Sequence, residues 1–133
     1  MALVSAETIP VLTEPDVVQV RRKVREVSAA LGFTLVDQTK VVTAASELAR
    51  NTIIYGGGGS LCLEILNGPR VGIRLIFEDD GPGIADIDLA LRDGYTTGSG
   101  LGLGLGGAKR LVNEFDIVSA PGQGTKVTLT RWK

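Results

Sequence analysis

The chain has 133 residues, a formal net charge of −1 and a pI near 5.4, which exclude a nucleic-acid binder that relies on a basic surface. It contains no histidine and one cysteine, so a Ser-His-Asp triad, a Cys-His dyad, a His-metal centre and a phosphohistidine acceptor are all excluded within the chain. At this length we expect one domain with a core of its own.

The location of the protein is predicted from apolar runs and from the cysteine. No apolar run approaches the ~20 residues of a transmembrane helix, and the first ten residues lack the basic and apolar regions of a signal peptide. Cys62 lies in an apolar, strand-like run, which favours a buried and reduced thiol. We therefore expect a soluble cytoplasmic protein that binds neither membrane nor nucleic acid.

The first part of the chain predicts a strand followed by two helices. A β-rich run at residues 7–13 precedes Asp16, which is expected to cap a helix. Apolar residues then recur every three or four positions until Gly32, as in an amphipathic helix. A second helix is expected from a capping Asp37 to Tyr55, where a run of four glycines ends it.

A hairpin comes next. Two apolar runs, residues 60–66 and 70–79, flank Asn67-Gly68, which is a strong hairpin signal. Pro69 indicates that the turn is longer than two residues.

The remaining pattern predicts a long loop, a helix and a second hairpin. The loop runs from residue 79 to 107 and contains at most a short helix near residues 86–93. A helix is expected to open at 106–115, and strands at 116–120 and 125–132. The element order β-α-α-β-β-loop-α-β-β predicts an α+β two-layer sandwich, a mixed β-sheet with helices on one face.

Glu47 and Asn51 are the first candidate functional residues. They are four positions apart in the second expected helix and so project from one face. A solvated helix surface is the alternative interpretation, but small residues surround the pair, as in a helix that packs closely on a sheet: Ala44, Ala45, Ser46 and Ala49. If the pair faces a pocket, the carboxylate is a candidate base and the amide oxygen is a candidate Mg²⁺ ligand.

An acidic, glycine-containing segment follows the strand that ends near residue 78. Asp79, Gly81 and Gly83 are typical of a β-turn, which is one interpretation. The other is that Asp79 points into a cleft and accepts a hydrogen bond from an exocyclic amine, while the glycines let a planar ring approach.

Residues 96–107 place glycine at nearly every second position. Gly102, Gly104 and Gly107 have the spacing of a dinucleotide fingerprint, but no strand directly precedes them and no acidic residue follows ~20 positions later. We interpret the segment instead as a flexible loop that leads into a helix N-terminus near Gly106, where free N–H groups bind an anion. Gly124-Thr125 is explained by a hairpin turn, with a ligand role as the alternative.

Together these motifs resemble those of the GHKL ATPases and kinases, which have the Bergerat ATP-binding fold. The four matching segments are an N-box at Asn51, a D-x-G-x-G box at Asp79-x-Gly81-x-Gly83, a G-x-G-L-G-L box at residues 100–105, and a Gly-Thr box at Gly124-Thr125. They occur in the order of the family and span nearly the whole chain. The resemblance implies one GHKL-type ATP-binding kinase domain over residues 1–133.

Among GHKL proteins the sequence is most similar to small bacterial serine kinases that control partner switches. Residues 37–56 and 106–117 are most similar to the switch kinase of the stressosome. Anti-sigma kinases of the RsbW and SpoIIAB kind, which sequester a sigma subunit and phosphorylate an anti-anti-sigma STAS protein, are the alternative.

The resemblance implies a role for each matching residue. Glu47 would be the catalytic residue, orienting or deprotonating a substrate hydroxyl, and Asn51 would bind the Mg²⁺ of ATP. The other matching residues would bind ATP: Asp79 at the adenine amino group, Gly81 and Gly83 by allowing close approach, Gly100, Gly102 and Gly104 through backbone N–H groups, and Thr125 from the sheet side. Residues 84 to about 100 would form a lid over the nucleotide.

The implied partners are STAS-domain proteins of a stressosome and a phosphatase. RsbS-like and RsbR-like STAS proteins would be the substrates, and the released kinase would activate an RsbU-like PP2C-type phosphatase. A basic run, Arg21, Arg22, Lys23 and Arg25, is either a docking surface for an acidic partner or a solvated helix face.

Overall fold

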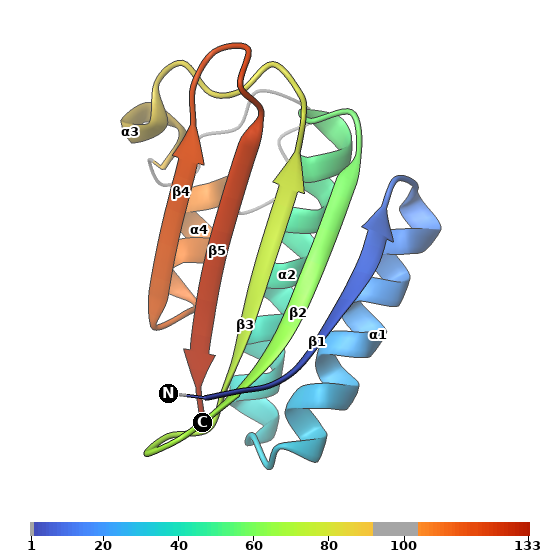
Figure 1. The fold of residues 1–133 in the computed structure, drawn as a ribbon, viewed down its shortest axis with the longest axis vertical. Helices are drawn as coiled ribbons and strands as arrows, with labels where there is room; N and C mark the ends of the chain where they lie inside the picture. Colours follow the sequence, from blue (N-terminus) through green and yellow to red (C-terminus); the bar gives the residue numbers. More distant parts are fainter. Residues whose placement is uncertain (1, 92–103) are drawn as a thin grey trace.

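Within residues 2–91 and 104–133, which the computed structural model describes, five strands form one sheet in the order β1-β2-β3-β5-β4 (Figure 1). The strands are β1 (Ala2–Val11), β2 (Gly59–Asn67), β3 (Gly72–Asp79), β4 (Glu114–Ser119) and β5 (Thr125–Trp132). Helices α1 (Glu14–Ala30), α2 (Leu35–Ile54) and α4 (Gly104–Arg110) cover one face, and the short α3 (Ile87–Ala90) lies at one end. The predicted α+β two-layer sandwich is confirmed.

The sheet differs from the expected mixed sheet in its strand directions. Each of the four strand pairings in the described residues is antiparallel. β3 and β4 run in the same direction, but β5 returns between them and pairs with both. The helical connection from β3 to β4 therefore creates no parallel pair.

Hydrogen bonds between side chains and backbone N–H groups mark where α1 and α2 begin. Asp16, expected as a cap, lies in the first turn of α1 and its Oδ2 accepts the N–H groups of Leu12 and Thr13 at 2.9 and 3.1 Å. The cap of α2 is Thr34 rather than Asp37, because Thr34 Oγ1 accepts the N–H of Asp37 at 3.1 Å. The caps are Thr13 and Thr34 instead of Asp16 and Asp37, so both helices start three residues earlier than the sequence pattern indicated.

The last helix is shorter than expected. α4 ends at Arg110, and Asn113 N–H already donates to Thr130 O of β5 at 3.0 Å. Residues 114 and 115, expected in the helix, pair with β5 as the start of β4. Backbone pairing with a neighbouring strand therefore overrides the local helical pattern.

The core lies between the helices and the sheet. Val20, Val24 and Val41 from the helices, and Leu75 and Leu129 from the sheet, are fully buried. Burial of this apolar surface is the main force that holds the two layers together. No helix in residues 2–91 and 104–133 is long and apolar enough to cross a bilayer.

The opposite face of the sheet carries no helix in the described part of the chain (Figure 1). Cys62 points to this face, since its neighbours Leu61 and Leu63 are buried on the helix side. The thiol is free but only half-buried, so the expectation of a buried cysteine is wrong. The exposure of Cys62 is set by the alternation of side chains along β2, which places it on the face opposite the helices.

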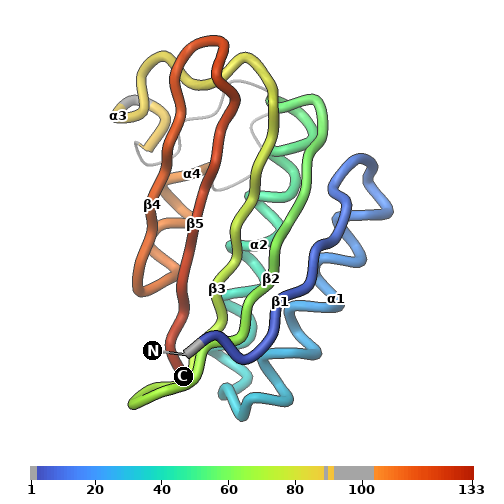
Figure 2. The backbone as a smooth tube through the Cα atoms, viewed as in Figure 1, coloured from blue at the N-terminus to red at the C-terminus, as the bar shows by residue number. Residues whose placement is uncertain are grey.

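Strand register brings four residues together at one end of the sheet. Gly59, Asp79, Thr125 and Ser119 lie directly opposite one another on β2, β3, β5 and β4. Directly opposite residues share a face, so this row points to the helix side. Ala2, which pairs with Asn67 at the far end of β2 from Gly59, and the C-terminus lie at the other end of the sheet (Figure 2).

Candidate nucleotide site

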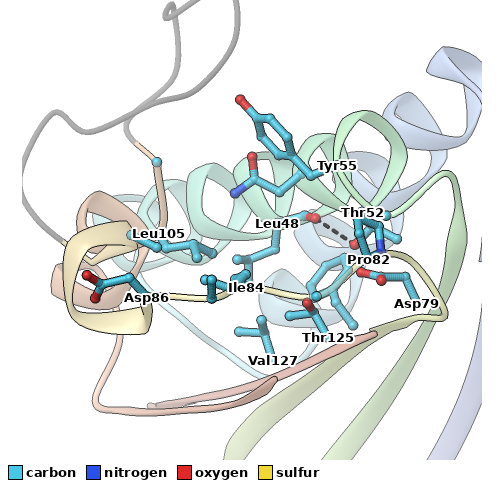
Figure 3. Close-up of a pocket in the computed structure, with 17 residues that line it drawn as sticks. Leu48, Thr52, Tyr55, Asp79, Pro82, Ile84, Asp86, Leu105, Thr125 and Val127 are labelled. Carbon is cyan, nitrogen blue, oxygen red and sulfur yellow. Dashed lines mark hydrogen bonds between the residues drawn. The ribbon is translucent and has the colours of Figure 1, made fainter. Parts of the chain in front are cut away.

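A cavity of about 420 Å³ opens on the helix side, at the end of the sheet that carries this row of residues (Figure 3). Its apolar walls come from α2, the strands, the segment after β3 and the start of α4: Leu48, Phe77, Ile84, Leu105 and Val127. Its polar groups include Asn51, Thr52, Asp79 and Thr125. Apolar walls with a few placed polar groups suit a flat, partly polar ligand such as a purine base.

Asp79 ends β3 and lines the cavity. Its Oδ1 accepts the N–H of Gly81 at 2.9 Å. Gly56, at the end of α2, lies so close that a Cβ on it would be 2.3 Å from Asp79 Cγ. The carboxyl group therefore has a fixed place, and glycine at position 56 makes the room for it.

Gly81 and Gly83 pack the acidic segment against other backbone. A Cβ on Gly81 would lie 2.7 Å from Gly56 Cα, and one on Gly83, which has φ +77°, would lie 2.0 Å from Ala120 O. Gly83 lines the cavity, whereas Gly81 does not. Their close contacts are thus with the protein's own backbone.

Thr125 faces Asp79 across the β3–β5 pair and lines the cavity (Figure 3). Its Oγ1 is 2.9 Å from Ser119 Oγ. Ser119 also accepts the N–H of Ile84 at 2.8 Å and donates to Gly124 O at 2.8 Å. One serine hydroxyl therefore ties the cavity threonine to both loops at this end of the sheet.

Asn51 lines the cavity from α2, while Glu47 lies beside it, one helical turn earlier. Glu47 is 8% exposed, its Oε2 accepts the N–H of Gly104 at 3.4 Å, and its Oε1 accepts from Arg50 Nη1 at 3.4 Å. These are long hydrogen bonds. The carboxylate is therefore held between an arginine and the first residue of α4.

Gly104, in the glycine-rich segment, lines the cavity and has φ +70°. It begins α4, two residues before the expected position. Gly100 and Gly102, expected to bind phosphate, lie outside the described residues. So do residues 92–100 of the expected lid.

The site contains residues that the motif pattern did not indicate, namely Arg50, Gly56 and Ser119. Arg50 follows Glu47 by three positions, a spacing at which helical side chains meet, so a charge-pair search would find it. Gly56 and Ser119 carry no such signal, because Gly56 meets Asp79 only through tertiary packing and Ser119 meets Thr125 only through strand pairing.

The polar groups fit Mg·ATP. Asp79 and Thr125 offer oxygen acceptors at one wall of an apolar cavity, as an amino-substituted base requires. In the described residues no group of three or more His, Cys, Asp or Glu side chains could hold a metal. A magnesium ion held by Asn51 would therefore complete its shell with phosphate oxygens and water, as Mg²⁺ commonly does.

The basic run on α1 is partly engaged within the chain. Lys23 Nζ pairs with Glu7 at 3.0 Å, and the hydrogen bond to Glu7 raises the pKa of Lys23. Arg25 Nη1 donates to Gln38 at 3.5 Å. Arg21 and Arg22 are exposed and leave the docking interpretation open for those two side chains.

Comparison with known sequences identifies the family. Residues 36–133 match the family described as histidine kinase-, DNA gyrase B-, and HSP90-like ATPase. Serine/threonine-protein kinase RsbT of Bacillus subtilis (strain 168) is 43% identical over 125 residues, which are 93% of this chain and 94% of RsbT. Anti-sigma F factor of Thermoanaerobacter sp. (strain X514) is 29% identical over 119 residues, 84% of this chain and 82% of that protein.

Solved structures share the fold at lower identity. The RsbU and RsbW domains of a Mycobacterium tuberculosis protein match with a TM-score of 0.66 and 23% identity, over 97% of this chain and 33% of that one. The SiaB-SiaC complex of Pseudomonas aeruginosa matches with a TM-score of 0.59 and 13% identity, over 98% of this chain and 91% of that one.

Proposed function

The chain belongs to the histidine kinase-, DNA gyrase B- and HSP90-like (GHKL) ATPase family and is a serine/threonine kinase similar to RsbT. From this premise we propose that it uses Mg·ATP to phosphorylate STAS-domain proteins of a bacterial stressosome. Once released from them, the kinase activates a PP2C-type phosphatase. The supporting relatives are RsbT itself and the solved RsbU and RsbW domains of the same fold.

Glu47 carries the proposal. Its carboxylate is buried beside the cavity, next to the residue at which the glycine-rich segment joins α4, and one turn from Asn51. The chain has no histidine, so a carboxylate is the available general base near neutral pH. Glu47 orients the target hydroxyl or accepts its proton.

The other residues position the nucleotide. Mg·ATP supplies the phosphoryl group, and its transfer depends mainly on positioning and charge neutralisation. Asp79 and Thr125 accept from the adenine amino group, with Gly81 and Gly83 holding the loop, and Asn51 binds Mg²⁺. Gly100, Gly102 and Gly104 donate backbone N–H groups to phosphate, for which Gly104 N–H gives up its long 3.4 Å hydrogen bond to Glu47.

The proposed partners are RsbS-like and RsbR-like substrates and an RsbU-like phosphatase, all in the cytoplasm. The similarity to RsbT over most of both chains supports them. A free thiol at Cys62 is compatible with a reducing compartment.

The test is phosphate transfer to a purified STAS-domain protein in the presence of Mg·ATP. Wild type labels a serine or threonine. Glu47→Gln, which keeps the side-chain volume and an acceptor for Gly104 N–H, lowers the rate at least about 100-fold while ATP affinity stays within about twofold.

Glu26→Gln, an exposed change on α1, serves as the matched control and keeps full activity. Full labelling by Glu47→Gln would show that Glu47 is not the base. If the wild type labels none of the STAS proteins tried, the proposal that STAS-domain proteins are its substrates is wrong.

An anti-sigma role is the second candidate, because several anti-sigma F factors match between 26% and 31% identity. Pull-down separates the two functions. A stable complex with a sigma subunit, in preference to STAS proteins or the phosphatase, would favour the anti-sigma role.

A further inference from the structure

Three residues on neighbouring strands lie side by side at the end of the sheet that carries the cavity. Ser119 on β4 lies opposite Thr125 on β5, and Thr125 lies opposite Asp79 on β3. Asp79 and Thr125 line the cavity, as Figure 3 shows, whereas Ser119 does not. Ser119 therefore acts on a ligand only through Thr125 or through the adjoining loops.

The direction of each hydrogen bond at Ser119 follows from its partners. A serine hydroxyl has one proton and two lone pairs. Gly124 O is a carbonyl and cannot donate, so the proton of Ser119 goes to it, over 2.8 Å. Ile84 N–H donates to one lone pair over 2.8 Å, which leaves the other for Thr125 Oγ1 at 2.9 Å.

The proton of Thr125 is consequently directed at Ser119. A threonine hydroxyl also has one proton, so Thr125 Oγ1 has only lone pairs to offer the cavity. Asp79 beside it offers carboxylate oxygens, one of which already accepts from Gly81. This wall of the cavity therefore presents acceptors and no side-chain hydroxyl donor.

The same contacts hold the two loops together. Gly122 N–H donates to Pro82 O at 2.7 Å, and a Cβ on Gly124, which has φ +74°, would lie 2.2 Å from Asp79 O. The turn between β4 and β5 thus packs on the acidic segment, with the Ser119 hydroxyl between them. That packing leaves little freedom for the hydrogen bonds of Ser119 to rearrange.

We propose that Ser119 is a positioning residue for purine selectivity: it keeps the Thr125 hydroxyl as an acceptor, so that the site prefers a 6-amino purine to a 6-oxo purine. A 6-amino group donates to these acceptors. A 6-oxo group would face them with its own lone pairs, and unpaired buried acceptors are costly. The inference rests on the proposed nucleotide-binding function and adds the residue that sets its selectivity.

The experiment compares binding of ATP and inosine triphosphate, which differ at position 6, by calorimetric titration with Mg²⁺. Wild type prefers ATP. In Ser119→Ala the Thr125 hydroxyl is free to turn and donate, so the preference falls on the order of tenfold, the equivalent of one hydrogen bond. Ser119→Thr keeps a hydroxyl at this position and therefore keeps the wild-type preference for ATP.

Ser119→Cys is a second variant that keeps the shape of the side chain but hydrogen-bonds weakly, and it loses the preference in the same way. Thr125→Val also loses it, and adding Ser119→Ala to Thr125→Val changes the ratio of the two affinities no further. Thermal denaturation of each variant reports its stability separately.

Two results would overturn the assignment of Ser119. One is an unchanged ATP preference in Ser119→Ala and Ser119→Cys, whatever their stability, which would make the residue purely structural. The other is a loss of preference by Ser119→Ala that persists in full on the Thr125→Val background. Failure of wild type to bind either nucleotide would instead contradict the proposed function.

Discussion

Gly56 shows how a single missing side chain shapes the site. It follows α2 and carries no motif signal, yet its Cα lies against the carboxyl group of Asp79 and the backbone of Gly81. Its φ is not in the left-handed region, so alanine is compatible with its backbone conformation. The requirement for glycine here is one of space.

Gly56→Ala is therefore expected to displace the Asp79 carboxyl group and weaken ATP binding by at least about tenfold, the loss of one hydrogen bond, with a small change in unfolding free energy. Calorimetric titration and chemical denaturation measure the two quantities.

Gly57→Ala is the matched control. Gly57 has φ +75° and an added Cβ would meet nothing within 4 Å, so alanine costs about 1 kcal/mol of unfolding free energy and leaves ATP affinity unchanged. If Gly56→Ala bound ATP as the wild type does, the position of Asp79 would not matter for binding.

At the scale of elements, one guanidinium joins a strand to two helix ends. Arg131 on β5 donates through Nη2 to Asp37 Oδ1 at 2.6 Å and through Nη1 to Leu111 O at 3.3 Å. Asp37 lies in the first turn of α2, and Leu111 follows α4 directly. The contact fixes the ends of both helices relative to the sheet, far from the cavity.

The hydrogen bond from Arg131 holds the pKa of Asp37 below its ordinary value. A carboxyl with a depressed folded-state pKa contributes stability above its unfolded pKa of about 3.9 and loses that contribution as the pH falls through the folded-state pKa. Asp37→Asn should therefore melt at a lower temperature than wild type at pH 7, and the difference should shrink below about pH 4.

Thermal denaturation from pH 7 to pH 3 measures this difference. Glu26→Gln, on an exposed face of α1, should show no such convergence. A gap between Asp37→Asn and wild type that stays constant down to pH 3 would mean that the ion pair contributes no stability.

At the scale of the whole molecule, the cavity exists only in the folded chain. Its walls come from α2, β3, β5, the segment after β3 and the start of α4, which are far apart in sequence. A ligand that binds only the folded state stabilises it, by about 2.7 kcal/mol at a concentration 100 times its Kd. Nucleotide binding is thus measurable as a rise in Tm.

Mg·ATP is expected to raise the Tm of wild type, and Asp79→Asn is expected to fold but show a much smaller rise. Asparagine keeps an oxygen acceptor for Gly81 N–H but replaces the second carboxylate oxygen with an amide donor. Asp80→Asn, an exposed neighbouring change, is the control and keeps the full rise. An equal rise in both variants would mean that Asp79 does not contact the nucleotide.

Local signals located most elements because they act over a few residues. Asn67-Gly68 placed the first hairpin, and the pattern at 125–132 placed β5 at its observed bounds. The local pattern was wrong where a distant partner decides: β1 extends back to Ala2 because it pairs with β2, and Glu114 joins β4 because it pairs with Thr130.

The sequence by itself determined the family, the order of elements and the chemical groups available: the carboxylates of Glu47 and Asp79, the amide of Asn51 and the glycines, with no histidine. Only the tertiary structure decided that Glu47 lies beside the cavity and that Gly56 and Ser119 belong to the site. The reason is that a sequence motif describes residues that are close in the chain, whereas strand register and backbone packing bring together residues that are distant in it.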